Sequence, residues 1–240
     1  MKLATFTAGG APELGLVEAD GMIPLSRLRP ALGADMKALI AGWPQLEREV
    51  RALAAEATER LPMADLSLRA PIARPGKVMA IGLNYADHIA ESGMETPPHQ
   101  IWFSKAVTSV TGPFDPVQIP KVSGFVDYEA EMVAVIGKGG RRIAEERALD
   151  HVIAYSLFND GSIRDWQFKG PQWTLGKNFD GTGPFGPFLV SADEVPPGGR
   201  GLRITTRLNG AVVQDANTDD LLFHIPELIA KVSEAMTLHP

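Results

Sequence analysis

Two glutamates separated by one residue, Glu129 and Glu131, have the spacing in this chain that most directly suggests chemistry. They lead into an apolar, β-branched run, residues 132–136, which predicts a buried strand. Alternate residues of a strand point to one face, so we expect both carboxylates on the same side. Such close charges raise each other's pKa unless a cation lies between them, and carboxylates suit Mg²⁺, Mn²⁺ or Ca²⁺. Two solvated glutamates at a strand end are the alternative, and the better interpretation of such a pair in isolation.

A second polar group follows the apolar run 151–158, which also predicts a buried strand. Asp160, Arg164 and Gln167 would share one helical face if a helix began at Asp160. An acid, a guanidinium and an amide at a strand end favour a ligand site, and a helix N-terminus favours an anion. The alternative is a capping aspartate with an i,i+4 salt bridge worth roughly a few tenths of a kcal/mol.

His88 and Glu91 lie three residues apart on a short helix predicted between Asn84, its expected cap, and Gly93. A carboxylate beside an imidazole orients the ring and stabilises its protonated form, as a general base requires. A surface histidine with an incidental acidic neighbour is the alternative. Lys177 lies in a glycine-rich loop, residues 175–187, that lacks the spacing of a phosphate-binding loop.

The surrounding pattern predicts the elements that must position these residues. Strands are expected over residues 3–6, 14–18 and 22–25, and then helical structure over 35–60 with a break at Gly42-Trp43-Pro44. A proline-rich connector places a domain boundary near residue 70, giving a small N-terminal domain (1–70) and a catalytic domain (71–240). Later elements are strands 77–81 and 101–104, a hairpin turning at Asn209-Gly210, and a helix over 225–236.

Composition narrows the classes of function. The chain has 240 residues, 45% of them hydrophobic, and a net charge of −6 with no basic cluster beyond Arg141-Arg142, so nucleic acid is not an expected partner. The absence of cysteine and of an apolar N-terminal run fits the cytoplasm. No stretch approaches the ~18 apolar residues of a membrane span, so no membrane partner is expected.

Three ordered motifs carry a family resemblance: Gly-Leu-Asn-Tyr-Ala-Asp-His-x-x-Glu (82–91), Asp-Tyr-Glu-Ala-Glu (127–131), and Tyr-x-x-x-Asn-Asp-x-Ser-x-Arg-Asp-x-Gln (155–167). From about residue 70 onward, the chain resembles the fumarylacetoacetate hydrolase superfamily. The resemblance implies an α+β fold, in which a mixed β-sheet forms a partial β-roll preceded by a small N-terminal α+β domain. It also implies a homodimer or a larger assembly.

The resemblance assigns roles to the candidate residues. Mg²⁺, or Mn²⁺ or Ca²⁺, would be held by Glu129, Glu131 and Asp160. His88, oriented by Glu91, would activate water. The substrate's carboxylate and developing oxyanion would be held by Arg164, Gln167 and Lys177. Two weaker guesses for the pocket wall are Tyr85 and Lys105.

The first functional hypothesis is a metal-dependent hydrolase that cleaves the carbon–carbon bond of acylpyruvate or β-diketo acids, with aromatic catabolism as its setting. A bound hard cation would stabilise the enolate of such an acid; activated water would attack the other carbonyl, and the carbon–carbon bond would then break with the enolate as the leaving group. The alternatives on the same metal site are an oxaloacetate-type decarboxylase and a 2-hydroxydienoate enol–keto isomerase. A non-catalytic metal-binding protein is a further alternative, and the sequence does not name the acyl group.

Two departures from the family pattern concern the pocket and the chain end. Gly161 and Ile163 stand where the family often has valine and alanine, which predicts a different pocket wall with unchanged ligands. Relatives normally continue beyond the position of Pro240 with a Gly-Asp turn and a Thr-Gly-Thr-Pro-like loop. A chain truly ending at Pro240 is expected to lack the closing strands of the roll.

Overall fold

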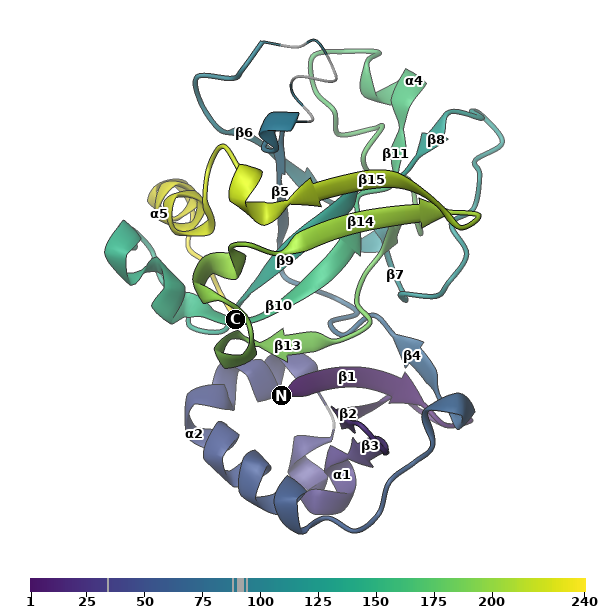
Figure 1. Cartoon of the computed structure of the whole chain (residues 1–240), viewed down its shortest axis with the longest axis vertical. Helices are drawn as coiled ribbons and strands as arrows, with labels where there is room; N and C mark the ends of the chain where they lie inside the picture. Colours follow the sequence, from purple (N-terminus) through teal and green to yellow (C-terminus); the bar gives the residue numbers. More distant parts are fainter. Residues whose placement is uncertain (34, 88, 90–92, 94) are drawn as a thin grey trace.

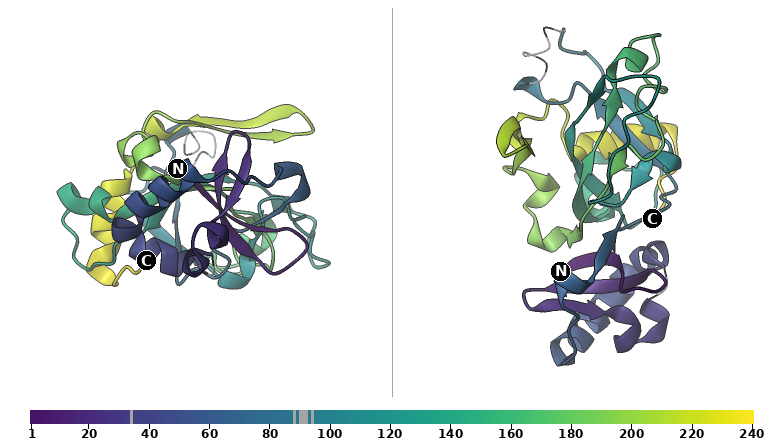
Figure 2. Two further views of the ribbon diagram at one scale, coloured as in Figure 1. Left: turned by 90° about the horizontal axis from the view of Figure 1, so that it is seen from below. Right: turned by 90° about the vertical axis from the view of Figure 1, so that its right-hand side faces the viewer.

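The computed structural model describes residues 1–33, 35–87, 89, 93 and 95–240. The fold is mixed α+β, as the sequence predicted, with many short strands and few helices. A smaller body, formed by the N-terminal residues, lies below a larger one that contains the rest of the chain (Figure 1). The view turned by 90° shows the same two-part arrangement (Figure 2, right).

A seven-stranded sheet connects the two bodies. Its order is β3-β2-β1-β13-β10-β9, with β4 pairing β1 beside this path, and all its pairings are antiparallel. The crossing point is the pairing of β1 with β13, where Leu3 lies opposite Leu189. The strands are β1 (Lys2–Thr7), β2 (Glu13–Glu18), β3 (Gly21–Pro24), β4 (Ser67–Arg69), β9 (Ala130–Ile136), β10 (Val152–Asn159) and β13 (Leu189–Ser191).

The N-terminal strands lie where the sequence predicted them, but the predicted break in the following helix was wrong. After the short helix α1 (Leu25–Leu28), α2 runs unbroken as Met36–Glu56 with Pro44 inside it. Its N-terminus is capped by Asp35, which accepts a hydrogen bond from the Lys37 amide at 2.9 Å. Trp43 and Val50 are buried, so packing of the apolar face outweighs the local cost of the proline.

The larger body adds four two-stranded sheets: β5 (Val78–Gly82) with β6 (Ile101–Lys105), β7 (Val110–Thr111) with β12 (Gly183–Pro184), β8 (Val126–Asp127) with β11 (Ser162–Ile163), and β14 (Arg203–Leu208) with β15 (Ala211–Asn217). The last pair is a hairpin that extends along one side of the molecule (Figure 2, left). Its turn residues Asn209 and Gly210 have φ of 50° and 85°, the left-handed conformation that the Asn-Gly pair predicted.

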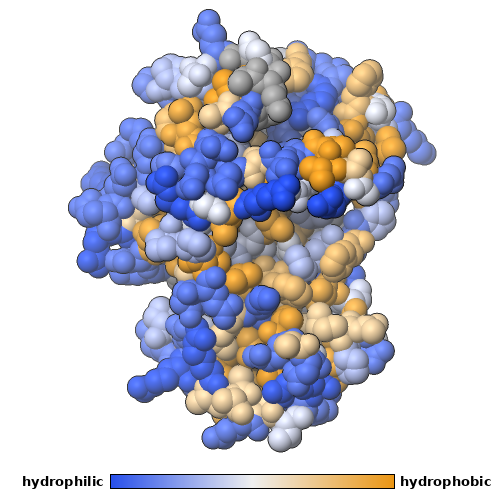
Figure 3. Space-filling model, viewed as in Figure 1, coloured by the Kyte–Doolittle hydropathy of each residue, from blue (hydrophilic) through white to orange (hydrophobic). Residues whose placement is uncertain are grey.

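The described part of the larger body includes the helices α4 (Arg164–Gln167) and α5 (Ile225–Ala235). Helix α5 packs its apolar side, including Ile229 and Val232, against the β9–β10 region. The space-filling view shows apolar residues along the junction of the two bodies on that face (Figure 3). Among the described helices, none is long and apolar enough to cross a membrane.

Candidate active site

The pairing of β9 with β10 brings the predicted acidic residues together. Glu131 lies opposite Phe158 in this register, close to the end of β10. At that end, the Asp160 amide donates to the Glu129 carbonyl at 2.8 Å, and the Asn159 side chain accepts from the Glu129 amide at 3.0 Å. The backbone itself therefore places Glu129, Glu131 and Asp160 in one neighbourhood.

Lys177 joins two of these acids. Its Nζ lies 2.6 Å from Glu129 Oε2 and 2.9 Å from Asp160 Oδ2, and its side chain is only 3% exposed. The preceding Gly176 accepts a hydrogen bond from the Ile163 amide at 2.8 Å, which ties the glycine-rich loop to β11. Since charge-assisted bonds are short and strong in such an environment, the lysine and the two carboxylates form one unit.

Arg164 contacts the same cluster from the opposite side. Its guanidinium lies 2.6 Å from Glu129 Oε1 and donates to Asp127 Oδ2 and to Gln167 Oε1, at 2.8 and 2.9 Å. The predicted helix start at Asp160 was wrong, because Ser162 and Ile163 pair with β8 and the helix begins at Arg164. Asp160 and Arg164 therefore meet through Glu129 rather than along one helical face.

The two weaker guesses for the pocket wall have different positions. Burial lowers the pKa of Lys105, and the neighbouring Asp160, whose Oδ1 lies 2.7 Å from its Nζ, opposes that shift. Burial also raises the pKa of the Tyr85 hydroxyl, with a further contribution from Glu131. Tyr85 lines the pocket beside the acids, whereas Lys105 lies behind Asp160.

His88 and Glu91, the predicted base and its orienting group, lie outside the described residues. Asn84, predicted to cap their helix, uses its side chain on the backbone of Phe223: it donates to the carbonyl at 3.0 Å and accepts from the amide at 2.8 Å. This pairing fixes the beginning of the segment against the chain that leads into α5. The roles of His88 and Glu91 remain predictions.

The chemistry of the cluster fits a hard divalent cation. Burial raises the pKa of Glu131 well above its ordinary value, and Glu129 and Asp160 add to the shift while Lys177 opposes it. Buried Asp160 Oδ1 accepts no hydrogen bond of normal geometry and has the Lys105 ammonium beside it at 2.7 Å. Carboxylate oxygens are the donors that Mg²⁺ and Mn²⁺ prefer. Within the described part of the chain, no three acidic or histidine side chains already form a metal-binding group, and the Lys177 ammonium contacts both Glu129 and Asp160.

A pocket of about 300 Å³ opens onto this cluster. Its polar side is formed by Glu129 and Glu131 with Arg164 and Lys177, and its other walls come from the β5–β6 region, the loop before Lys177 and the β14–β15 hairpin. These walls include Ile81, Leu83, Phe103, Phe168, Trp173, Ile204, Val213 and Ala216. The site can thus bind a small anion with an apolar or neutral distal part.

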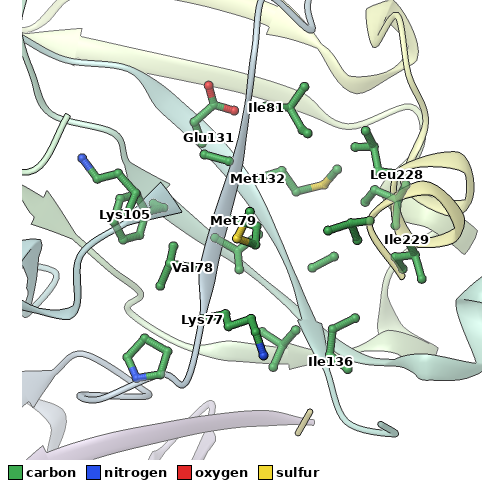
Figure 4. A pocket seen from close by; sticks show the side chains of 18 of the residues that line it. Lys77, Val78, Met79, Ile81, Lys105, Glu131, Met132, Ile136, Leu228 and Ile229 are labelled. Carbon is green, nitrogen blue, oxygen red and sulfur yellow. The ribbon is translucent and has the colours of Figure 1, made fainter. Parts of the chain in front are cut away.

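A second, mainly apolar cavity of about 340 Å³ lies between β5, β9 and α5. Glu131 and Lys105 lie toward one side of it, and Leu228 and Ile229 of α5 lie on the other (Figure 4). Glu131 is shared with the site pocket. The two spaces therefore meet at the acidic cluster.

Sequence reasoning assigned no role to two polar residues of this site. Asp127 binds Arg164 through Nε and Nη2, and the signal was present, because Asp127, Glu129 and Glu131 are alternate residues. Gln214 of β15 accepts from the Ala130 amide at 2.9 Å, which fixes the hairpin over the site. No local pattern predicts that contact.

A charged pocket at the ends of paired strands, with acids, lysine and arginine in mutual contact, is typical of enzyme sites. Residues 77–240 match the model of the fumarylacetoacetate hydrolase C-terminal family, and the chain belongs to that family. The chain is 39% identical over 247 aligned residues to an oxaloacetate tautomerase of Xenopus laevis, a mitochondrial protein, covering all of this chain and 77% of the relative.

Solved structures extend the comparison. Maleylpyruvate hydrolase from Sphingobium sp. SYK-6, crystallised with manganese(II) and pyruvate, superposes with a TM-score of 0.84 at 31% identity, covering 100% of this chain and 85% of that one. The 5-carboxymethyl-2-hydroxymuconate delta-isomerase of Mycobacterium smegmatis superposes with a TM-score of 0.77 at 29% identity, covering 100% of this chain and 84% of that one. These relatives are a tautomerase, a hydrolase and an isomerase, and one was crystallised with a divalent metal and a keto acid.

Proposed function

We propose that this chain is a divalent-metal-dependent enzyme that forms and stabilises the enolate of a 2-oxo acid with a second carbonyl or carboxylate group. The observation that carries the proposal is the contact of Lys177 and Arg164 with Glu129 at the floor of the pocket. Enolate chemistry needs cationic donors at the developing oxyanion and a fixed seat for the substrate carboxylate. Keto–enol tautomerisation of an oxaloacetate-type acid is the first candidate, supported by the 39% identical Xenopus tautomerase.

Each residue then has a role. Glu129, Glu131 and Asp160 would hold the cation, which when bound supplies Lewis-acid stabilisation of negative oxygen on the substrate. Arg164 and Gln167 would bind the carboxylate, since a planar guanidinium suits that group. Lys177 would donate a hydrogen bond to the enolate oxygen.

Hydrolytic cleavage of an acylpyruvate is the second candidate, supported by the similarity to maleylpyruvate hydrolase. It requires an additional general base for water, a role that we propose for His88 with Glu91 as its orienting group. Tautomerisation and decarboxylation need no attacking water. The residue that separates the candidates is therefore His88 rather than the shared cluster.

The test is an assay of oxaloacetate and acetylpyruvate with Mn²⁺ or Mg²⁺, in which enol absorbance, pyruvate, released carboxylate and CO₂ are followed separately. A tautomerase accelerates conversion of the enol to the keto form without forming pyruvate, a second carboxylate or CO₂. A hydrolase forms pyruvate and a carboxylate from acetylpyruvate. His88→Ala should reduce kcat for cleavage roughly 10²–10⁴-fold if the hydrolase candidate holds. Absence of all three reactions with either metal would reject the proposal.

We also propose that the protein is a homodimer and that it acts in the breakdown of aromatic compounds. The segment between β7 and β8 exposes four large apolar side chains, of Phe114, Ile119, Val122 and Phe125. Surfaces that bind a partner expose apolar side chains, so this segment is the proposed dimer surface. Light scattering during gel filtration measures the mass directly, and a monomer at micromolar concentration would contradict the dimer.

A further inference from the structure

Lys105, the last residue of β6, is a buried lysine to which the proposed reaction gives no task. It is 4% exposed, and lysine is seldom buried to this degree unless it is paired. Desolvation of an ammonium costs several kcal/mol, so its contacts must offset that cost. Those contacts show what the residue does.

The ammonium of Lys105 connects β6 to two other segments of the chain, residues 160–161 and the loop at Lys177. It lies 2.7 Å from Asp160 Oδ1, donates to the backbone carbonyl of Lys177, and lies 3.4 Å from the carbonyl of Gly161. Asp160 directly follows β10, while Lys177 belongs to the glycine-rich loop. One side chain thus holds a proposed metal ligand and the backbone of a proposed oxyanion donor in a single arrangement.

The two oxygens of Asp160 are divided between two lysines. Oδ2 accepts from Lys177 at 2.9 Å, while Oδ1 has the Lys105 ammonium beside it at 2.7 Å. Because Oδ1 accepts no hydrogen bond of normal geometry, the ion pair with Lys105 is what restrains it. Without Lys105 the carboxylate could rotate away from the site.

Lys105 is not among the described residues that line the site pocket. It lines the apolar cavity together with Asp160 and Glu131, and Figure 4 shows it on the same side of that cavity as Glu131. We therefore propose that Lys105 is a positioning residue, which orients Asp160 for the divalent cation and fixes the backbone at Lys177. This inference rests on the metal site of the proposed function.

If Lys105 were simply a counter-charge, its removal would change the metal affinity in the opposite direction. An ammonium next to a metal ligand repels a dication, so removing a pure counter-charge should tighten metal binding. Removing a group that orients a ligand should weaken binding, and loss of outer hydrogen-bonding partners typically costs 10–100-fold in metal affinity. The direction of the change therefore decides between the two roles.

The experiment measures Mn²⁺ binding by calorimetry to the wild type, Lys105→Met, Lys105→Gln and a control, Lys77→Met. Lys77 also lines the apolar cavity, and its exposed ammonium contacts the Thr237 carbonyl at 3.1 Å, far in sequence from the cluster. Circular dichroism of each protein checks that it is folded. Both neutral Lys105 variants should bind Mn²⁺ about 10–100-fold more weakly, and the control should match the wild type.

Equal or tighter binding by a folded Lys105 variant would overturn the inference and leave Lys105 as a counter-charge. Loss of the folded signal in both Lys105 variants would also overturn it, because the lysine would then support the fold as a whole. If the wild type itself bound no Mn²⁺, the metal site of the proposed function would fail instead. Glutamine retains an N–H donor, so its weaker defect relative to methionine would further support positioning.

Discussion

Replacing Glu131 by glutamine should change both stability and metal binding, in opposite directions. Burial and the neighbouring carboxylates raise the pKa of Glu131 well above its ordinary value, so the native protein without metal retains a proton that the unfolded chain releases. The native state then binds more protons than the unfolded state over this range of pH. The stability contributed by this proton is greatest below the ordinary glutamate pKa and is lost as pH rises through the window between that pKa and the raised pKa of the folded protein.

The size of this effect follows from one proton. Within the window, each pH unit should lower the free energy of unfolding of the wild type by about 1.4 kcal/mol relative to Glu131→Gln. Urea denaturation in the presence of EDTA, at several pH values from 4 upward in steps of about one unit, measures this slope. Glu145→Gln, an exposed residue of the same type, is the control and should keep the wild-type slope.

Mn²⁺ binding provides the second half of the test. A metal ligand must be deprotonated, so the wild type should release about one more proton on binding than Glu131→Gln, as calorimetry in two buffers shows. Affinity of the wild type should rise with pH up to about tenfold per unit below the raised pKa, while the variant binds much more weakly. Equal slopes and equal affinity in the two proteins would refute both the buried acid and its role as a ligand.

Two further substitutions test the parts of the site next to Glu131. Arg164→Lys loses the planar guanidinium that contacts both Asp127 and Glu129, so kcat/KM should fall about 10–100-fold, chiefly through a higher KM. An unchanged KM in steady-state kinetics would show that Arg164 does not bind the substrate. Gly161→Ala should lower the free energy of unfolding, measured in urea, by about 1–3 kcal/mol, because its Cβ would lie 2.1 Å from the Thr182 carbonyl oxygen. Wild-type stability of this variant would show that the backbone shifts to accommodate the methyl group.

The sequence predicted the elements of the site better than their geometry. The E-x-E spacing predicted that Glu129 and Glu131 share one side, because alternation along a strand is a local property, and both line the site pocket, Glu131 from β9 and Glu129 from the position just before it. The contact of Lys177 with Glu129 and Asp160 was not predictable, since it depends on a loop whose path is set by distant hydrogen bonds. Local pattern also failed for α2, where burial of Trp43 outweighs the break that Pro44 suggested.

Gly161 shows how a departure from a family motif acquires a physical meaning. The sequence predicted only that glycine in place of valine would alter the pocket wall. In the structure, the space that a side chain would need at this position is taken by the Thr182 carbonyl, and the Gly161 carbonyl faces the Lys105 ammonium at 3.4 Å. The small residue thus permits a close approach of two backbone segments beside Asp160.

The shared contacts of Glu129 predict coupling between the proposed cation site and the proposed substrate site. Its two carboxylate oxygens contact different cations, Oε1 with Arg164 and Oε2 with Lys177. If Glu129 also binds a metal, the three positive centres compete for one carboxylate, and cation binding must loosen at least one of these ion pairs. The released guanidinium or ammonium would then be free to bind the substrate carboxylate or enolate oxygen. Metal binding and substrate binding should therefore be mutually reinforcing, with each tightening the other by the same factor.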